Sequence, residues 1–156
     1  MPELPEVEVV KRSLRKNIIN SVITNVLTNT KKLRYEVPKR DFQKIKNHKI
    51  ISITRRSKYL LINTNKEQTI LVHLGMTGKF ILMDKNRKLK KTSFYYSLDN
   101  NDKKHNHVIF NLNKKKKLIY NDVRKFGFIK IYNSNFIKKS QHLTHLGPEP
   151  LKKDWN

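Results

Sequence analysis

Residues 49–83 read KIISITRRSKYLLINTNKEQTILVHLGMTGKFILM, and this stretch decides the fold class. Runs rich in isoleucine, leucine, valine and aromatic residues alternate with short turns that carry asparagine, lysine or glycine. That pattern is typical of consecutive short β-strands, here predicted at residues 49–56, 59–63, 69–74 and 79–83.

The same pattern continues on both sides of this stretch. Further strands are predicted at residues 22–28, 33–37, 107–112, 117–121 and 127–132. Residues 84–102 are polar and rich in lysine and are expected to form a loop, and residues 136–141 a short helical turn. Many short strands with regular turns indicate a β-sandwich.

Two helices are expected beside the strands. Residues 5–16 place Val7, Val10 and Leu14 on one helical face, with Pro5 in the first turn, where its missing N–H is not needed. Residues 38–47 form the second helix, with Phe42 and Ile45 facing inward. The predicted fold is therefore mainly β with flanking helices, a two-layered β-sandwich with an N-terminal helix and a second helix.

The composition narrows the class of partner. The 156 residues fit one domain, and the net charge of +23 indicates a polyanion. Of the 35 basic residues 27 are lysine, a bias that suits A·T-rich codons, so the lysine runs at 31–32, 90–91 and 114–117 are interpreted as solvated loops. Cysteine is absent, which excludes disulfides and cysteine-based zinc sites. No apolar run has the length of a membrane span, and the acidic N-terminus is unlike a signal peptide.

The first ten residues, MPELPEVEVV, carry a candidate nucleophile. Removal of Met1 would leave Pro2 as an N-terminal secondary amine, whose attack on a sugar carbon gives an iminium with a fixed positive charge. Glu3 and Glu6 lie one turn apart at the start of the helix, so both can face this amine. The alternative is that these acids only complement the helix dipole.

This N-terminus resembles that of the formamidopyrimidine-DNA glycosylases, bacterial base-excision enzymes for oxidised purines. Five further segments match the family in order and extend the resemblance over the whole chain. They are RRSKYLL at 55–61, HLGMTG at 73–78, KHNHV at 104–108, NDVRKFG at 121–127 and THLGPEPL at 144–151.

The resemblance implies roles for individual residues. Pro2 would attack the anomeric carbon, Glu3 would act as general acid or base with Glu6 as its neighbour, and Lys58 would anchor phosphate and assist strand cleavage. Met76, Arg124 and Phe126 would fill the gap left by a flipped base. The residues expected to bind DNA are Lys58, His73, Met76, His105, Arg124 and Phe126.

The resemblance also leaves some points open. The family usually has proline where this chain has Val123, which affects the rigidity of that loop. Without the family, Met76 and Phe126 could be ordinary core residues, but their positions beside Gly75 and Gly127 favour the tips of loops. Lys58 would be an ordinary basic residue at a strand end. The spacings His105-x-His107 and His142-x-x-His145 could indicate a metal, but they lack acidic or cysteine neighbours, so no metal site is expected.

The implied organisation is a catalytic β-sandwich domain at residues 1–135 and a hinge at 136–156. The hinge would lead to a helix-two-turn-helix and zinc-finger domain that is missing, so no cofactor is expected in this chain. The implied function is DNA repair by a bifunctional glycosylase and abasic-site lyase. Its partner would be double-stranded DNA with oxidised purines or abasic sites, bound by a monomer in the bacterial cytoplasm and nucleoid, with no membrane involved. The alternatives are a truncated, non-catalytic DNA-binding remnant and a basic RNA- or ribosome-associated protein.

Overall fold

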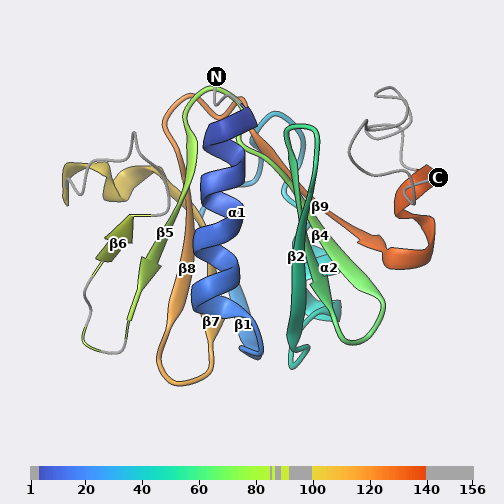
Figure 1. Cartoon of the computed structure of the whole chain (residues 1–156). Helices are drawn as coiled ribbons and strands as arrows, with labels where there is room; N and C mark the ends of the chain where they lie inside the picture. Colours follow the sequence, from blue (N-terminus) through green and yellow to red (C-terminus); the bar gives the residue numbers. More distant parts are fainter. Residues whose placement is uncertain (1–3, 85, 87–88, 92–99, 140–156) are drawn as a thin grey trace.

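The computed structural model describes residues 4–84, 86, 89–91 and 100–139 (Figure 1). Within these residues the chain forms two α-helices, nine strands and two short 3-10 helices. In chain order they are α1 (Leu4–Ile18), β1 (Ile23–Thr28), α2 (Lys39–Lys44), β2 (Ile50–Arg56), β3 (Tyr59–Thr64), β4 (Gln68–His73), β5 (Gly78–Met83), β6 (Leu89–Lys91), η1 (Asn100–His105), β7 (Asn106–Leu112), β8 (Lys117–Asp122), β9 (Phe128–Asn133) and η2 (Ser134–Lys139).

The strands form two antiparallel sheets. One has the order β1-β7-β8-β5-β6 and the other the order β2-β3-β4-β9. Figure 1 shows the two sheets side by side with α1 running along the opening between them. The predicted two-layered β-sandwich with two helices is therefore confirmed.

Both helices contribute to the core between the sheets. Val7, Val10 and Leu14 of α1 are fully buried, as the helical periodicity predicted. In α2 Phe42 and Ile45 are buried, and the Phe42 ring meets the edge of Phe110 at a centroid distance of 5.6 Å. Burying each such side chain stabilises the fold by about 1.5–3 kcal/mol, so packing against the sheets stabilises even the short helix α2. None of the helices in the described part of the chain is long and apolar enough to cross a membrane.

Two predictions about secondary structure were wrong. Residues 33–37 form no strand, because Arg34 N–H donates to the Gly127 carbonyl and Val37 N–H to the Lys31 carbonyl, which makes a loop with only one isolated bridge. Leu33 and Val37 of this segment are buried nevertheless, because the loop folds back on itself through the hydrogen bond from Val37 to Lys31. Residues 84–102, expected to be a loop, contain the strand β6 and the start of η1.

Smaller differences concern element ends. The helix expected at 38–47 is the shorter α2, and α1 extends beyond 5–16 at both ends. The short helical turn expected at 136–141 is η2, which begins two residues earlier. The proposed domain boundary after residue 135 stays a prediction, and most of the expected hinge lies outside the described residues.

A charge cluster ties α1 to β2. The Glu8 carboxylate accepts hydrogen bonds from Arg55 Nε at 2.9 Å and Arg12 Nε at 3.2 Å, and Lys11 Nζ lies 2.9 Å away. Burial alone would raise the pKa of Glu8, but the hydrogen bonds and positive charges of Lys11 and Arg55 outweigh it and lower the pKa from 4.5 to about 2. Glu8 therefore stabilises the fold as an anion.

The two sheets are joined at one end by the β4–β5 and β8–β9 connections, and a buried carboxylate holds both. Asp122 is fully buried and accepts hydrogen bonds from Thr77 Oγ1 at 2.6 Å and the Lys125 N–H at 3.0 Å through Oδ1. Its Oδ2 accepts from the Tyr120 hydroxyl at 2.8 Å and the Gly127 N–H at 3.0 Å. Three donors from the two connections and one from strand β8 thus converge on one side chain.

We expect Asp122→Asn to destabilise the fold. The amide keeps the shape of the carboxylate but places N–H donors against donors, so at least one buried group loses its acceptor, at a cost of about 1–3 kcal/mol. Urea denaturation measures this loss. The control Asp41→Asn removes only an exposed ion pair with Lys44 and is expected to cost less than about 1 kcal/mol. Equal losses in the two variants would contradict the central role of Asp122.

The Glu8 cluster predicts a pH dependence. Because the pKa of Glu8 is lower in the folded than in the unfolded chain, its contribution is complete above about pH 4.5 and is lost as the pH falls towards 2. Glu8→Gln should lower the free energy of unfolding by roughly 1–3 kcal/mol at pH 7, and the difference from the unaltered chain should shrink below pH 4.5. Glu36→Gln, at an exposed position, is the control. A difference that does not change with pH would show that Glu8 acts through packing.

Candidate nucleic-acid interface and active site

One end of the sandwich gathers most of the residues singled out in the sequence. The start of α1, the β2–β3 turn, and the β4–β5 and β8–β9 connections all lie at the upper end in Figure 1. Strand register agrees, since Gly78 pairs with Asp122 and His73 pairs with both Tyr59 and Phe128. The fold therefore places segments that are far apart in the sequence at a common edge.

The tips of two connections expose large side chains. Met76 is 45% exposed and Phe126 48% exposed, so neither belongs to the core, and their predicted position at loop tips is confirmed. Arg124 is exposed beside them, with its Nη1 4.0 Å from the Met76 sulfur. We call Met76, Arg124 and Phe126 the tip cluster.

The Asp122 network sets the backbone under the tip cluster. Arg124 N–H donates to Thr77 Oγ1 at 2.9 Å, and the same hydroxyl donates to Asp122. Gly75 has a φ of +61°, and a Cβ there would overlap the Gly127 backbone. The two loops thus touch through glycine backbone, which brings Met76 beside Arg124. Val123, where the family usually has proline, is 45% exposed and lies in the same loop.

His73, predicted to bind DNA, lies below the tip cluster. Its ring stacks on Phe128 with a centroid distance of 5.5 Å and meets Tyr59 edge-on at 5.2 Å. Its Nδ1 accepts a hydrogen bond from the Gly75 N–H at 3.0 Å. His73 therefore orients the β4–β5 loop, and its contact with DNA stays a prediction.

Lys58 lies in the β2–β3 turn at the same end. The turn is shaped by Ser57, whose φ is +51°, and Arg55 Nη1 donates to the Ser57 carbonyl at 3.0 Å. Because Arg55 also binds Glu8, the turn that carries Lys58 is anchored to α1. Lys58 is half-buried there, and its predicted roles in phosphate binding and strand cleavage are untested.

Glu6 is the one proposed catalytic residue of the N-terminus that the structure describes. It is only 5% exposed, and its Oε2 has no hydrogen-bond partner among the described residues. Burial raises the pKa of Glu6. A carboxyl in this environment holds a proton closer to neutral pH than an exposed one does. Pro2 and Glu3 lie outside the described residues.

The His105-x-His107 pair has two separate environments. His107 is buried, with Nδ1 2.6 Å from Thr30 Oγ1 and Nε2 2.7 Å from the Asp122 carbonyl. Burial lowers its pKa, and Lys125 and His105 add to this effect against the Asp122 hydrogen bond. Since both ring nitrogens bind protein groups, His107 is a structural link. His105 is half-exposed at the end of η1, and in the described part of the chain no group of three or more histidine or acidic residues is placed to hold a metal.

The sequence interpretation missed Asp122, Thr77 and Tyr120. Asp122 was quoted within NDVRKFG without a role. The available signal was an acid at the end of a buried strand, followed five residues later by glycine. Its four donors could not be assigned in advance, because they come from two different loops and from strand β8.

Comparisons with known proteins agree with this arrangement. Residues 1–129 match the family described as the formamidopyrimidine-DNA glycosylase N-terminal domain. The chain is 41% identical over 151 residues to the formamidopyrimidine-DNA glycosylase of Rickettsia felis and 40% identical to that of Rickettsia bellii, in each case covering 97% of this chain and 50% of the relative. It thus spans about half the length of the curated relatives it matches.

Solved structures give the same result. Lactococcus lactis Fpg in complex with DNA that contains an abasic site superposes with a TM-score of 0.70 and 26% identity, over 88% of this chain and 45% of that one. The complex of the same enzyme with DNA that contains an oxidised pyrimidine gives a TM-score of 0.71 and 27% identity, over 88% and 47%. With the tip cluster, the Asp122 network and the matching N-terminal segment in place, the chain belongs to the family of the formamidopyrimidine-DNA glycosylase N-terminal domain.

Proposed function

We propose that this chain is the nucleophile-bearing half of a bifunctional DNA repair glycosylase that removes oxidised purines and then nicks the strand. The observation that carries the proposal is the tip cluster, held rigidly by Asp122 at the same end of the sandwich as the start of α1. A DNA-binding activity is supported by the net charge of +23 and by the DNA complexes of the Lactococcus lactis structures.

The first chemical step belongs to Pro2. Its lone pair would attack C1′ of the damaged nucleotide while the bond from C1′ to the base breaks and the base leaves with a proton from a general acid. The amine then loses its proton, and the C1′–O4′ bond breaks as O4′ takes up a proton. This leaves an open-chain iminium, which draws electrons from C2′. A base removes a C2′ proton, the electron pair forms a C2′=C3′ double bond, and the C3′–O bond breaks, so the 3′ phosphate leaves and the strand is nicked. Water then hydrolyses the iminium and frees Pro2. Glu3 is the proposed general acid or base.

Glu6 supports this chemistry through its environment. Burial raises the pKa of Glu6, so this carboxyl holds a proton more readily than an exposed one does. Proton donation to a leaving base requires a partly protonated carboxyl, and Glu6 is proposed to support Glu3 in this role. Lys58, on the turn anchored by Arg55, would bind a phosphate beside the lesion.

The tip cluster would hold the DNA open. Extruding a nucleotide loses stacking worth a few kcal/mol, and apolar or planar side chains inserted at the gap offset part of that loss. Met76 and Phe126 are apolar, Arg124 is planar and charged, and all three are exposed before any DNA binds. The loops therefore need little rearrangement to enter the base stack.

The nucleophile can be tested by borohydride trapping on DNA that bears an abasic site. Reduction of the iminium should link the chain covalently to DNA, and Pro2→Gly should reduce the trapped product sharply. Pro5→Ala, an exposed proline three residues further on, is the matched control and should trap normally. Trapping that survives Pro2→Gly, or mass spectrometry that finds Met1 retained, would refute the mechanism. DNA binding without any trapping would instead favour a non-catalytic DNA-binding role.

Because the side chains of the tip cluster are exposed, we expect their truncation to weaken binding to damaged DNA without a large loss of fold stability. Met76→Ala and Phe126→Ala should each weaken binding to duplexes with an abasic site by about 1–3 kcal/mol, the value of one lost stacking contact, while binding to undamaged duplex changes little. Ile51→Ala, which truncates a side chain of equal exposure on β2, is the control. Fluorescence anisotropy and thermal denaturation measure the two effects. A large loss of stability would show that these side chains support the fold.

A further inference from the structure

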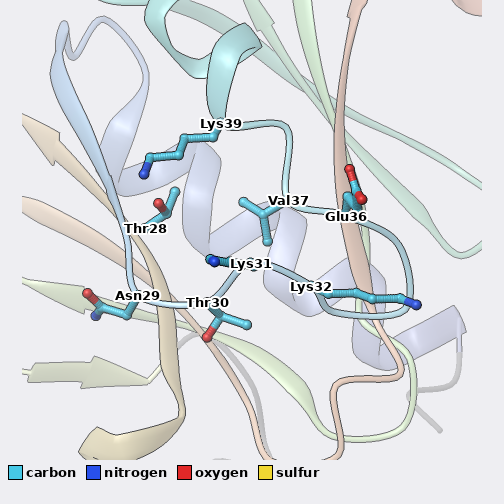
Figure 2. Close-up of a pocket in the computed structure, with 8 residues that line it drawn as sticks. All are labelled: Thr28, Asn29, Thr30, Lys31, Lys32, Glu36, Val37 and Lys39. Atoms are coloured by element: carbon cyan, nitrogen blue, oxygen red, sulfur yellow. The ribbon is translucent and has the colours of Figure 1, made fainter.

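A basic pocket opens beside the loop that follows β1. Its volume is about 700 Å³, and it lies between the end of β1 and the start of α2 (Figure 2). Its lining residues are Thr28, Asn29, Thr30, Lys31, Lys32, Glu36, Val37 and Lys39. The three lysines are exposed, so the pocket is accessible to a large ligand.

The positive charge in this pocket is uneven. Figure 2 shows Lys31 and Lys39 on the side of Thr28, whereas Lys32 and Glu36 extend to the other side. Among the ion pairs formed by the described residues, none involves a lysine of the pocket. The Thr28 side therefore holds two ammonium groups with no acid among its lining residues, which favours an anion.

Hydrogen bonds connect the pocket loop to the tip cluster. Thr30 Oγ1 lies 2.6 Å from His107 Nδ1, and His107 Nε2 donates to the Asp122 carbonyl at 2.7 Å. Further along the same loop, Arg34 N–H donates to the Gly127 carbonyl at 3.1 Å. The pocket is thus fixed to both ends of the segment that carries Arg124 and Phe126.

We propose that this pocket binds a backbone phosphate of the duplex beyond the tip cluster, with Lys31 and Lys39 as the two cations. The proposal rests on the proposed function, because it takes its ligand from the DNA held at the tip cluster. Each strand presents one phosphate per about 3.4 Å of helix axis, so a duplex that continues past the tip cluster presents phosphates to the adjoining pocket. Lysines that contact phosphate hold the DNA in position without reading its sequence.

The test compares the salt dependence of DNA binding by the 156-residue chain and its variants. Affinity for a duplex with an abasic site is measured by anisotropy over a range of salt concentrations. Each phosphate contact contributes about 0.9 to the slope of log affinity against log salt, so the double variant Lys31→Gln/Lys39→Gln, which removes the contact to one phosphate, should lower the slope by about 0.9. Duplexes extended to different lengths on one side of the lesion locate the contact, because the variant should lose the gain in affinity that extension gives.

The matched control is Lys115→Gln/Lys117→Gln, two exposed lysines of the β7–β8 hairpin at the opposite end of the sandwich. This control variant removes the same charge and should leave the slope nearly unchanged. The variant Lys31→Arg/Lys39→Arg keeps both positive charges and should have the slope of the unaltered chain. Equal slopes for the pocket variant and the control variant, whether both are lowered or both unchanged, would refute the proposal that the pocket binds a phosphate. If only the pocket proposal is wrong, the unaltered chain still binds DNA with an abasic site and is trapped on it through Pro2. If the chain binds no DNA, the proposed function fails as well.

Discussion

The buried carboxylate of Asp122 is the interaction on which the functional end of this molecule depends. A carboxylate has room for four hydrogen-bond donors, and here Thr77, Tyr120, Lys125 and Gly127 supply all four. Burial of a charge is costly unless it is fully hydrogen-bonded, and this network meets that condition. Burial and the neighbouring Asp122 charge also raise the pKa of Tyr120 well above its usual range, which keeps its hydroxyl as a donor.

The network explains how apolar side chains can stay exposed at a defined position. About half of each side chain of Met76 and Phe126 is exposed, so the loop backbone is the main determinant of their position. That backbone is held by Asp122 from below and by the close approach of Gly75 and Gly127 from the side. Buried polar contacts thus offset the conformational entropy lost when the two loops become ordered, and the exposed side chains remain available to a partner.

The two glutamates of α1 show how position alone separates two carboxyl groups. Glu8 faces Arg55 and Lys11, and its pKa falls to about 2. Glu6, half a turn away, is buried without a hydrogen-bond partner for Oε2 among the described residues, and its pKa rises. One helix thus presents an anion that anchors β2 and a second acid that holds a proton more readily than an exposed carboxyl does. The same residue type anchors the fold in one case and has a proposed chemical role in the other.

Local patterns in the sequence determined the strands, the inward faces of Val7, Val10 and Leu14, and the exposed loop positions of Met76 and Phe126, because these depend on periodicity and on neighbouring glycines. The motifs also determined the family. Tertiary structure alone decided the rest. Residues 33–37 have the composition of a strand, but their backbone partner at Gly127 lies far along the chain. The four donors of Asp122 likewise come from two loops and from strand β8, which the two sheets bring together, and such long-range contacts leave no periodic signal in the sequence.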